Sequence, residues 1–266
     1  MRAYAAILSA RFRLLLQYRA AAIAGFGTQL FWGLIRTMIF VAFYESATGG
    51  SGLAAGLSKD QTVSYVWLGQ AFLLLIMLGV DGDVAAMIRN GNVLYELVKP
   101  LDLYGLWYCR MLAQRVTPTC LRAAPQLIFA MAVGWLQWPD WPTVLAFAAC
   151  IVGAALLSAA VCMLMNISMF WTVSGVGVIR FIGAAAYLLG GIMLPLPMFP
   201  DSWQWVLNLQ PFRGLGDAPF RLFIGNIPLG GFVGVVLHQL IWTAALVLLG
   251  RWLLARAMRR LVVQGG

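Results

Sequence analysis

Few side chains of this 266-residue chain carry the functional groups of a catalytic centre. His238 is the single histidine, which excludes an H-E-x-x-H zinc site. The two lysines, Lys59 and Lys99, are followed by Asp and Pro, so the chain lacks a G-x-x-x-x-G-K-[ST] phosphate loop and ATP hydrolysis of its own. No nucleophile and base are paired in a recognisable motif. We therefore expect no catalytic residue, no metal site and no cofactor on this chain.

The composition indicates a different kind of protein. Hydrophobic residues make up 62% and charged residues 10% of the sequence, whereas soluble domains contain roughly 25% charged residues. This predicts an all-α integral membrane protein in which residues 1–266 form a single transmembrane domain. The net charge of +9 does not indicate nucleic-acid binding, because the basic residues are scattered at the ends of apolar segments. The four cysteines form no C-x-x-C pair and are expected to be buried free thiols.

Six apolar segments are predicted to be membrane-spanning helices, because about 20 residues cross a hydrocarbon core of ~30 Å. They are residues 20–44, 62–80, 116–135, 143–170, 181–194 and 229–249. Pro195 and Pro197 end the fifth of them early. Residues 198–228 are too polar to cross a bilayer and too apolar for a free loop, so we expect an external re-entrant segment of two short helices in the outer leaflet.

Residues 1–19 have the pattern of an amphipathic helix that lies in the membrane interface. Apolar residues recur on one face, with Arg2 and Arg13 on the other. A signal peptide is the competing interpretation, but charge persists to Arg19 and no clear cleavage site follows.

The basic residues predict the orientation of the helices. Most of the 18 Lys and Arg residues lie in predicted inner segments, and the predicted outer ones hold only Lys59, Arg213 and Arg221. The positive-inside rule then places both termini in the cytoplasm. We expect a multi-pass protein of the bacterial plasma (inner) membrane.

Arg36 and His238 are ionisable residues inside predicted spans. A charge at that depth is costly, so Arg36 either serves function or pairs with a neighbouring helix, and the lack of an acidic residue within a span favours pairing. The same two interpretations apply to His238. All nine carboxylates lie in loops or at span ends, which argues against an ion-coupled transporter.

The segment 81–115 is the long charged stretch inside the chain and is predicted to be a cytoplasmic loop. It contains two short amphipathic helices, separated by Gly91 and ended by Pro100. Their apolar faces comprise Val84, Met87 and Ile88, and Val93, Leu94, Leu97 and Val98. Such a rigid surface helix indicates a docking element, and an ordinary interfacial connector is the alternative.

This order of elements resembles the membrane (permease) subunit of a type-2 ABC exporter over the whole chain. The most specific stretches are GNVLYELVKPL at 91–101 and NLQPF at 208–212, with Pro219 and Gly225 downstream. Both stretches are similar to stretches in the branch of the family whose permeases are often encoded as two unlike sister subunits beside one ATPase. The motifs do not identify the cargo.

The resemblance implies that 81–115 holds a coupling helix that docks on a cytosolic nucleotide-binding ATPase subunit, which would bind ATP and Mg²⁺. Glu96 and Lys99 would supply polar contacts, and Leu94 and Leu97 apolar anchors. The implied docking set is Met87, Ile88, Arg89, Val93, Leu94, Glu96, Leu97 and Lys99. A second permease, as a sister subunit or a second copy, and membrane lipids would be the other partners.

The resemblance also implies a path between two permeases, lined by the first, second and fifth predicted spans. The implied lining set is Phe26, Phe31, Trp32, Phe40, Phe72, Tyr187 and Met193. These aromatic and aliphatic side chains suit efflux of an amphipathic or hydrophobic small molecule, lipid or peptide. For each of them, lipid contact or core packing is the alternative. A gradient-driven secondary transporter and a non-transporting membrane scaffold remain the alternative functions.

Overall fold

The computed structural model describes residues 9–10, 13–14, 19–47, 53–54, 56–98, 100–172 and 175–259. The predicted interfacial helix over residues 1–19 lies almost wholly outside these ranges. The α-helices are α2 (Arg19–Ala47), α3 (Lys59–Ala71), α4 (Leu73–Ile76), α5 (Gly82–Arg89), α6 (Val93–Leu97), α7 (Leu103–Ala132), α8 (Trp141–Ser168), α9 (Val176–Leu189), α10 (Asp201–Leu209), α11 (Asp217–Phe223) and α12 (Phe232–Met258). Shorter elements are β1 (Leu53–Ala54), β2 (Leu57–Ser58), η1 (Leu196–Met198), η2 (Pro211–Leu215) and η3 (Leu229–Gly231).

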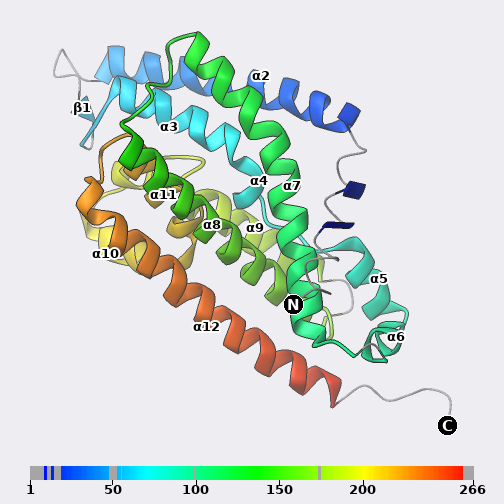
Figure 1. The fold of residues 1–266 in the computed structure, drawn as a ribbon. Coiled ribbons are helices and arrows are strands. Elements are labelled where there is room, and N and C mark those ends of the chain that lie inside the picture. Colours follow the sequence, from blue (N-terminus) through cyan, green and yellow to red (C-terminus); the bar gives the residue numbers. More distant parts are fainter. Residues whose placement is uncertain are drawn as a thin grey trace.

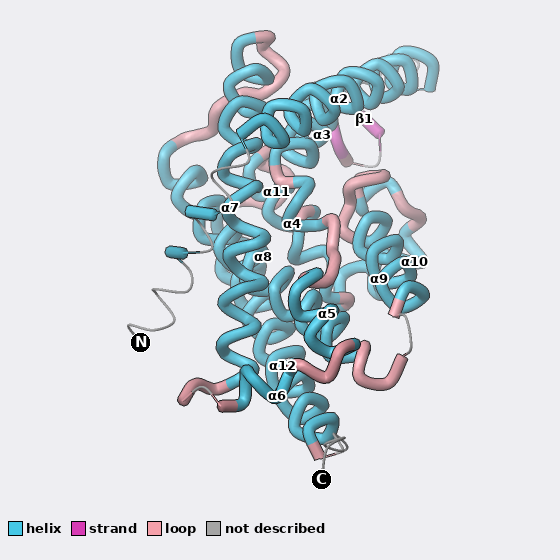
Figure 2. Tube along the Cα trace, turned by 90° about the vertical axis from the view of Figure 1, so that its right-hand side faces the viewer, coloured by secondary structure: helices cyan, strands magenta, loops and turns pink. Residues whose placement is uncertain are grey.

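The bundle is built around α8. Helices α7 and α12 pack along α8, and α11 and η2 cover its first half, while α2 packs on α3 and α7. Figure 1 shows α2 along one edge of the bundle and α12 along the opposite edge, and Figure 2 shows the same helices from the side. Large apolar side chains face outward, as expected of helices in lipid. They include Ile23, Met38, Ile39, Leu145, Val152, Val233, Ile241 and Leu248.

Among the described residues, three segments are long and apolar enough to cross a membrane. They are Ile23–Ser46, Trp141–Ser168 and Leu229–Met258. These match the predicted first, fourth and sixth spans. Helix α9 is a shorter apolar helix of 14 residues that ends at Leu189 with Gly190 as its C-cap, before the prolines that were predicted to end it. A helical membrane architecture is therefore confirmed, whereas the number of six spans stays a prediction.

Helix α7 is longer than the predicted span 116–135, because it begins directly after Asp102. The Asp102 Oδ2 atom accepts the Gly105 N–H at 2.9 Å, which caps the helix. Trp107 and Met111, four residues apart, are fully buried in a cluster with α8 and α12. The last part of the predicted loop is therefore helical and packed.

The predicted second span is broken at Phe72, between α3 and α4. Helix α4 then ends at Ile76, and the carbonyl groups beyond it have no continuing helix to bind them, so Arg115 of α7 binds them instead. Its Nη1 donates to the Met77 carbonyl at 2.6 Å, and Nη2 donates to Gly79 at 3.4 Å. Arg115 is buried, so this bond replaces water at a helix end, as the membrane requires.

The segment 198–228 contains α10 and α11, with η2 between them; their position in the outer leaflet stays a prediction. Asp217 at the start of α11 is fully buried. Its Oδ1 accepts the Tyr65 hydroxyl at 3.0 Å and the Leu196 N–H at 3.1 Å, while Arg221 lies 3.5 Å from Oδ2. Burial raises the pKa of the Asp217 carboxyl, and Arg221 opposes that shift. This carboxyl joins α3, η1 and α11.

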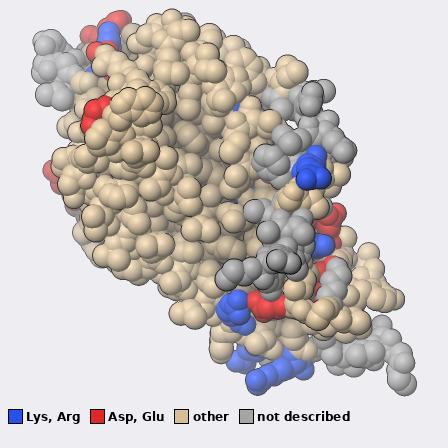
Figure 3. Space-filling model, viewed as in Figure 1, with Lys and Arg blue, Asp and Glu red and all other residues tan. Residues whose placement is uncertain are grey.

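Charged side chains gather at two ends of the face in Figure 3, with a broad uncharged band between them. Lys and Arg atoms form a group near the C-terminal end of α12, which contains Arg251 and Arg256. This separation is the pattern that a bilayer imposes.

The cysteines at 109, 120, 150 and 162 are all free, as predicted. Cys150 and Cys162 are buried, whereas Cys120 is exposed on α7. The prediction of buried thiols is therefore wrong for Cys120, because α7 turns that side chain away from the core.

We predict that Arg115→Met lowers the melting temperature by about 5 °C, because it leaves several carbonyl groups of a broken helix without a donor. Thermal unfolding of the purified protein in detergent measures this. Arg180→Met removes an exposed arginine from α9 and is the matched control. An equal loss in both variants would show that the Arg115 bonds contribute nothing specific.

Candidate functional site

The α5–α6 pair holds the predicted docking residues, and its start is fixed to α8. The Asp81 Oδ1 atom caps α5 by accepting the N–H groups of Asp83 at 2.8 Å and Val84 at 3.3 Å. The Asp81 N–H donates to Asn166 Oδ1 of α8 at 3.2 Å. Because Asp81 and Asn166 are both buried, this hydrogen bond joins the first turn of α5 directly to α8.

The far end of the pair is fixed as well. Gly91 adopts a φ of 71°, a conformation that favours glycine and turns the chain from α5 into α6. Val84 and Val93 are then fully buried against α7 and α8. Asp102, just beyond α6, binds Arg251 of α12 at 2.9 Å. The pair is thus a surface element joined to α8 through Asp81, and the chain that follows α6 reaches α12 through a half-exposed ion pair at the start of α7.

The predicted docking residues do not share one face. Val93 and Glu96 are buried, and Glu96 forms an ion pair with Arg110 of α7 at 3.5 Å. These two side chains therefore position α6 from within. Leu97 is 47% exposed. Met87, Ile88 and Leu94 are partly buried, and Arg89 is exposed. Lys99 lies outside the described residues.

Two exposed side chains beside Leu97 were missed by the sequence-based docking set. Tyr95 is 75% and Val98 83% exposed, and their spacing of three places them on one side of the helix. Val93 and Glu96 have the same spacing on the buried side, and in a helix of five residues this spacing alone does not tell the buried side from the exposed one. We call Tyr95, Leu97 and Val98 the docking edge.

The second region is a cavity of about 490 Å³ between α2, α3–α4 and α9, here called the α2–α9 cavity. Its lining is Thr28, Gln29, Trp32, Ile35, Arg36, Ile39, Gln70, Leu73, Met77 and Tyr187. Aliphatic and aromatic side chains supply most of the wall, with two amides and one guanidinium group among them. A cavity of this kind suits an amphipathic molecule.

Arg36 has a structural role in this cavity. Its Nη1 donates to the Ile192 carbonyl at 2.6 Å, and this carbonyl lies beyond the end of α9. Its Nη2 donates to the Tyr187 hydroxyl, and the guanidinium carbon lies 5.4 Å from the Tyr187 ring centroid. These contacts support the pairing interpretation of Arg36, through a carbonyl and a phenol.

Gln29 and Gln70 bring unused hydrogen-bonding capacity to the cavity. Gln29 is only 4% exposed, yet neither amide atom has a hydrogen-bond partner among the described residues. Gln70 is equally buried, and its Oε1 also has no partner in this part of the chain. An unsatisfied buried amide costs about 1–3 kcal/mol. The two amides thus give the cavity free donors and acceptors that sequence reasoning missed.

Of the predicted path residues, Trp32 and Tyr187 line the cavity. Phe31 is exposed beside Trp32, and its ring lies 5.9 Å from that of Trp32 in an edge-to-face arrangement. Met193 is exposed just after α9. The structure therefore brings two of these residues together and leaves two on the outer surface.

The remaining predicted path residues are buried or half-buried. Phe72 is buried between Phe147 and Phe220, with ring centroids 5.5 and 6.2 Å away. Phe40 is also buried, and Phe26 is half-buried. Phe72 therefore packs in the core, which was the alternative interpretation of the path residues.

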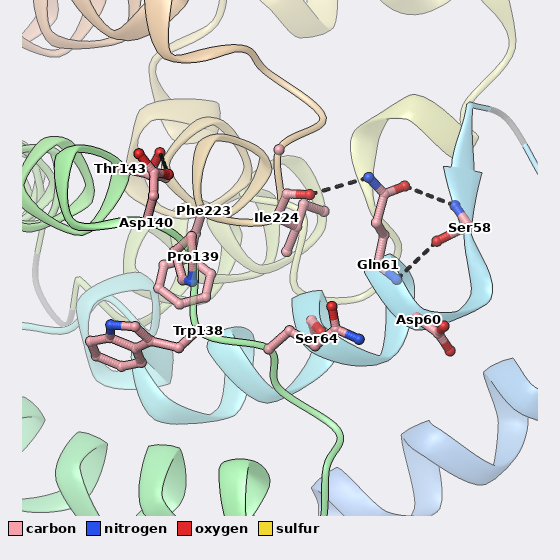
Figure 4. Close-up of a pocket in the computed structure, with 12 residues that line it drawn as sticks. Ser58, Asp60, Gln61, Ser64, Trp138, Pro139, Asp140, Thr143, Phe223 and Ile224 are labelled. Carbon is pink, nitrogen blue, oxygen red and sulfur yellow. Dashed lines mark hydrogen bonds between the residues drawn. The ribbon is translucent and has the colours of Figure 1, made fainter.

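A further cavity, of about 550 Å³, lies between the start of α3 and the turn before α8. Figure 4 shows Gln61 bridging Ser58 and the Ile224 carbonyl in this cavity. Ser58 and Gln61 form a capping box, and Asp140 Oδ1 accepts the Thr143 hydroxyl at 2.6 Å. These polar groups hold turns in place, so the cavity has a structural explanation.

Comparison with known proteins identifies the family to which this chain is similar. A family model described as "ABC-2 family transporter protein" matches residues 30–265. Among curated proteins, no match was found. The matched range includes α5–α6 and almost all of the α2–α9 cavity lining.

We predict opposite effects of one substitution at two buried glutamines. Gln29→Met removes an unsatisfied amide and should raise the melting temperature by about 3 °C. Gln239 is equally buried, but its Nε2 donates to the Cys150 and Gly214 carbonyls at 2.9 and 2.8 Å. Gln239→Met should lower the melting temperature by about as much. Thermal unfolding compares them, and destabilisation by Gln29→Met would show that its amide is bonded.

Proposed function

Since the chain belongs to the ABC-2 family of transporter proteins, we propose that it is the permease subunit of an ATP-driven exporter. ATP would be hydrolysed on a separate cytosolic subunit, and the cargo would be amphipathic. The observation that carries this proposal is the docking edge, three exposed apolar side chains on a surface element that is fixed to the bundle. An apolar edge of this kind fits a protein partner.

Movement of the ATPase partner would be transmitted to the bundle through the two ends of the α5–α6 pair. A partner that pushes on α6 acts on α8 through Asp81 and Asn166, and on α12 through Asp102 and Arg251. Since α8 packs against α7 and α12, movement of the pair would reach the helices that define the bundle. Rigid-body motion of packed helices is an established way of switching a transporter.

Docking of a cytosolic ATPase at α5–α6 also agrees with the distribution of charged residues. The basic group at the end of α12 lies at the same end of the bundle as α5 and α6 (Figure 1 and Figure 3). The positive-inside rule makes this the cytoplasmic end of a bacterial inner-membrane protein. The six-span topology follows if α3–α4, α7 and α9 cross with the three long apolar helices.

We predict that Leu97→Asp weakens binding of the ATPase subunit at least about tenfold and lowers the ATPase activity of the complex in proportion. Leu97 is exposed, so the charge should not disturb folding, unlike a change at the buried Glu96. Co-purification and ATP hydrolysis measure the effect.

Leu209→Asp is the matched control, because Leu209 is 65% exposed on α10 at the other end of the bundle. Equal loss in both variants, or none in either, would refute the docking edge. Purification of the native protein without any ATPase would favour a non-transporting scaffold.

The α2–α9 cavity is our proposed section of the cargo path. Its mixture of aromatic wall and free amides supports an amphipathic cargo. A second permease would complete the path, since apolar side chains remain exposed beside the cavity. They are Phe31, Met38, Ile39, Phe181 and Met193.

We predict that a cysteine at position 32 reacts with a water-soluble maleimide about tenfold faster than one at position 145, because a thiol reacts as its thiolate and needs water. Both substitutions, Trp32→Cys and Leu145→Cys, go into a chain that also carries Cys109→Ser and Cys120→Ser. Leu145 is 70% exposed on the apolar surface of α8, so it reports lipid contact. Equal rates in membranes would place Trp32 in lipid and outside the path.

A further inference from the structure

A basic cavity of about 490 Å³ lies between α10, η2, α11 and the first turns of α12, here called the α10–α12 cavity. Figure 1 shows α10 and the start of α12 far from the α5–α6 pair, at the other end of the bundle. The cavity is lined by Gln204, Asn208, Arg213, Ala218, Arg221, Ile227, Gly231, Gly234, Val235 and His238. No Asp or Glu is among these residues, whereas two arginines and the histidine are.

Arg213 is held in place but is not neutralised. Its Nη1 donates to the side-chain oxygen of Asn208 at 2.7 Å and to its carbonyl at 3.1 Å. Its Nε has no hydrogen-bond partner among the described residues. Burial lowers the pKa of Arg213, the charge of Asp217 opposes this shift, and the nearby charge of Arg221 lowers the pKa further. Burial and Arg221 both disfavour the guanidinium charge, so an anion placed here would stabilise it.

Arg221 approaches the cavity from α11. Its Nε donates to Asn226 Oδ1 at 2.7 Å, and its Nη1 lies 3.5 Å from Asp217 Oδ2. Asp217 is fully buried and already accepts bonds from Tyr65 and Leu196. The one carboxylate nearby therefore balances a single arginine, and the lining keeps a net positive charge.

His238 completes the set from a third element. It lies on α12 and lines the same cavity, and its Nδ1 lies 3.3 Å from the position that a Cβ would take on Gly214. The imidazole is thus next to the segment that carries Arg213. Guanidinium groups bind phosphate in a planar, bidentate way, and here they approach from two elements with an imidazole from a third.

We propose that the α10–α12 cavity binds a phosphate-type anion, presented either by the headgroup of an anionic phospholipid or by a free ion. The bound phosphate group would accept hydrogen bonds from Arg213, Arg221 and His238 and offset the repulsion between the two arginines. It would also hold α10 and η2 against α12. This site is independent of the ATPase partner, so the proposal is tested on the purified chain without nucleotide.

The test compares melting temperatures of the full chain under matched conditions. One arm uses nanodiscs of phosphatidylcholine with and without about one third phosphatidylglycerol. The other uses phosphatidylcholine nanodiscs in sodium phosphate or in sodium chloride of equal ionic strength. We expect a rise of about 3 °C in at least one arm, as for a ligand that binds only the folded state.

Variants assign the effect to the cavity. Arg213→Gln should abolish the rise, Arg213→Lys should retain only part of it because it keeps the charge but loses the bidentate geometry, and Lys59→Gln should retain all of it. Lys59 is an exposed cation at the start of α3 and controls for general charge. A response only to phosphatidylglycerol identifies the lipid as the source, and one only to phosphate identifies a soluble anion. No rise in either arm, or a rise that survives Arg213→Gln, overturns the proposal.

Discussion

Several helix interruptions among the described residues leave carbonyl groups that need a donor, and long side chains from distant helices supply it. In a bilayer these carbonyls have no water, so an unpaired one costs several kcal/mol. Arg36 of α2 binds the Ile192 carbonyl beyond α9, and Arg115 of α7 binds the Met77 carbonyl beyond α4. Gln239 does the same for a carbonyl of η2. The broken helices are therefore possible only where such donors reach them.

These donors also account for the position of the cavities. A helix that stops inside the bundle leaves space as well as free carbonyls, and the side chain that caps it lines that space. Arg36 caps the end of α9 and lines the α2–α9 cavity, and Arg213 binds the Asn208 carbonyl near the end of α10 and lines the α10–α12 cavity. Polar groups in this apolar chain thus collect where the helices are short. Functional chemistry is expected at the same places.

The sequence predicted a helical membrane protein and its three long helices, because length and apolar composition are enough to identify α2, α8 and α12. It could not predict which carbonyl each arginine binds, since Arg36 and Ile192 are 156 residues apart. Arg115 is the last residue of the predicted cytoplasmic loop and was expected to lie in water. In the structure it is buried, and its guanidinium group binds the Met77 carbonyl inside the bundle. The orientation of α6 was ambiguous, because a five-residue helix is too short for hydrophobic periodicity to separate Tyr95 from Glu96.

One short stretch of chain connects the α5–α6 pair with the α2–α9 cavity. Met77 lines the cavity, and its carbonyl accepts the bond from Arg115. Four residues later, Asp81 caps α5 and binds Asn166 of α8. A displacement of α5 would therefore pull on residues 77–81 and on the Arg115 bonds before it reached any other part of the cavity wall. Arg115 also donates weakly to the Leu74 and Gly79 carbonyls, at 3.5 and 3.4 Å. A small displacement could therefore strengthen one of these bonds while it weakens the bond to Met77. This stretch is the shortest covalent route by which docking at one end could change the shape of the cavity.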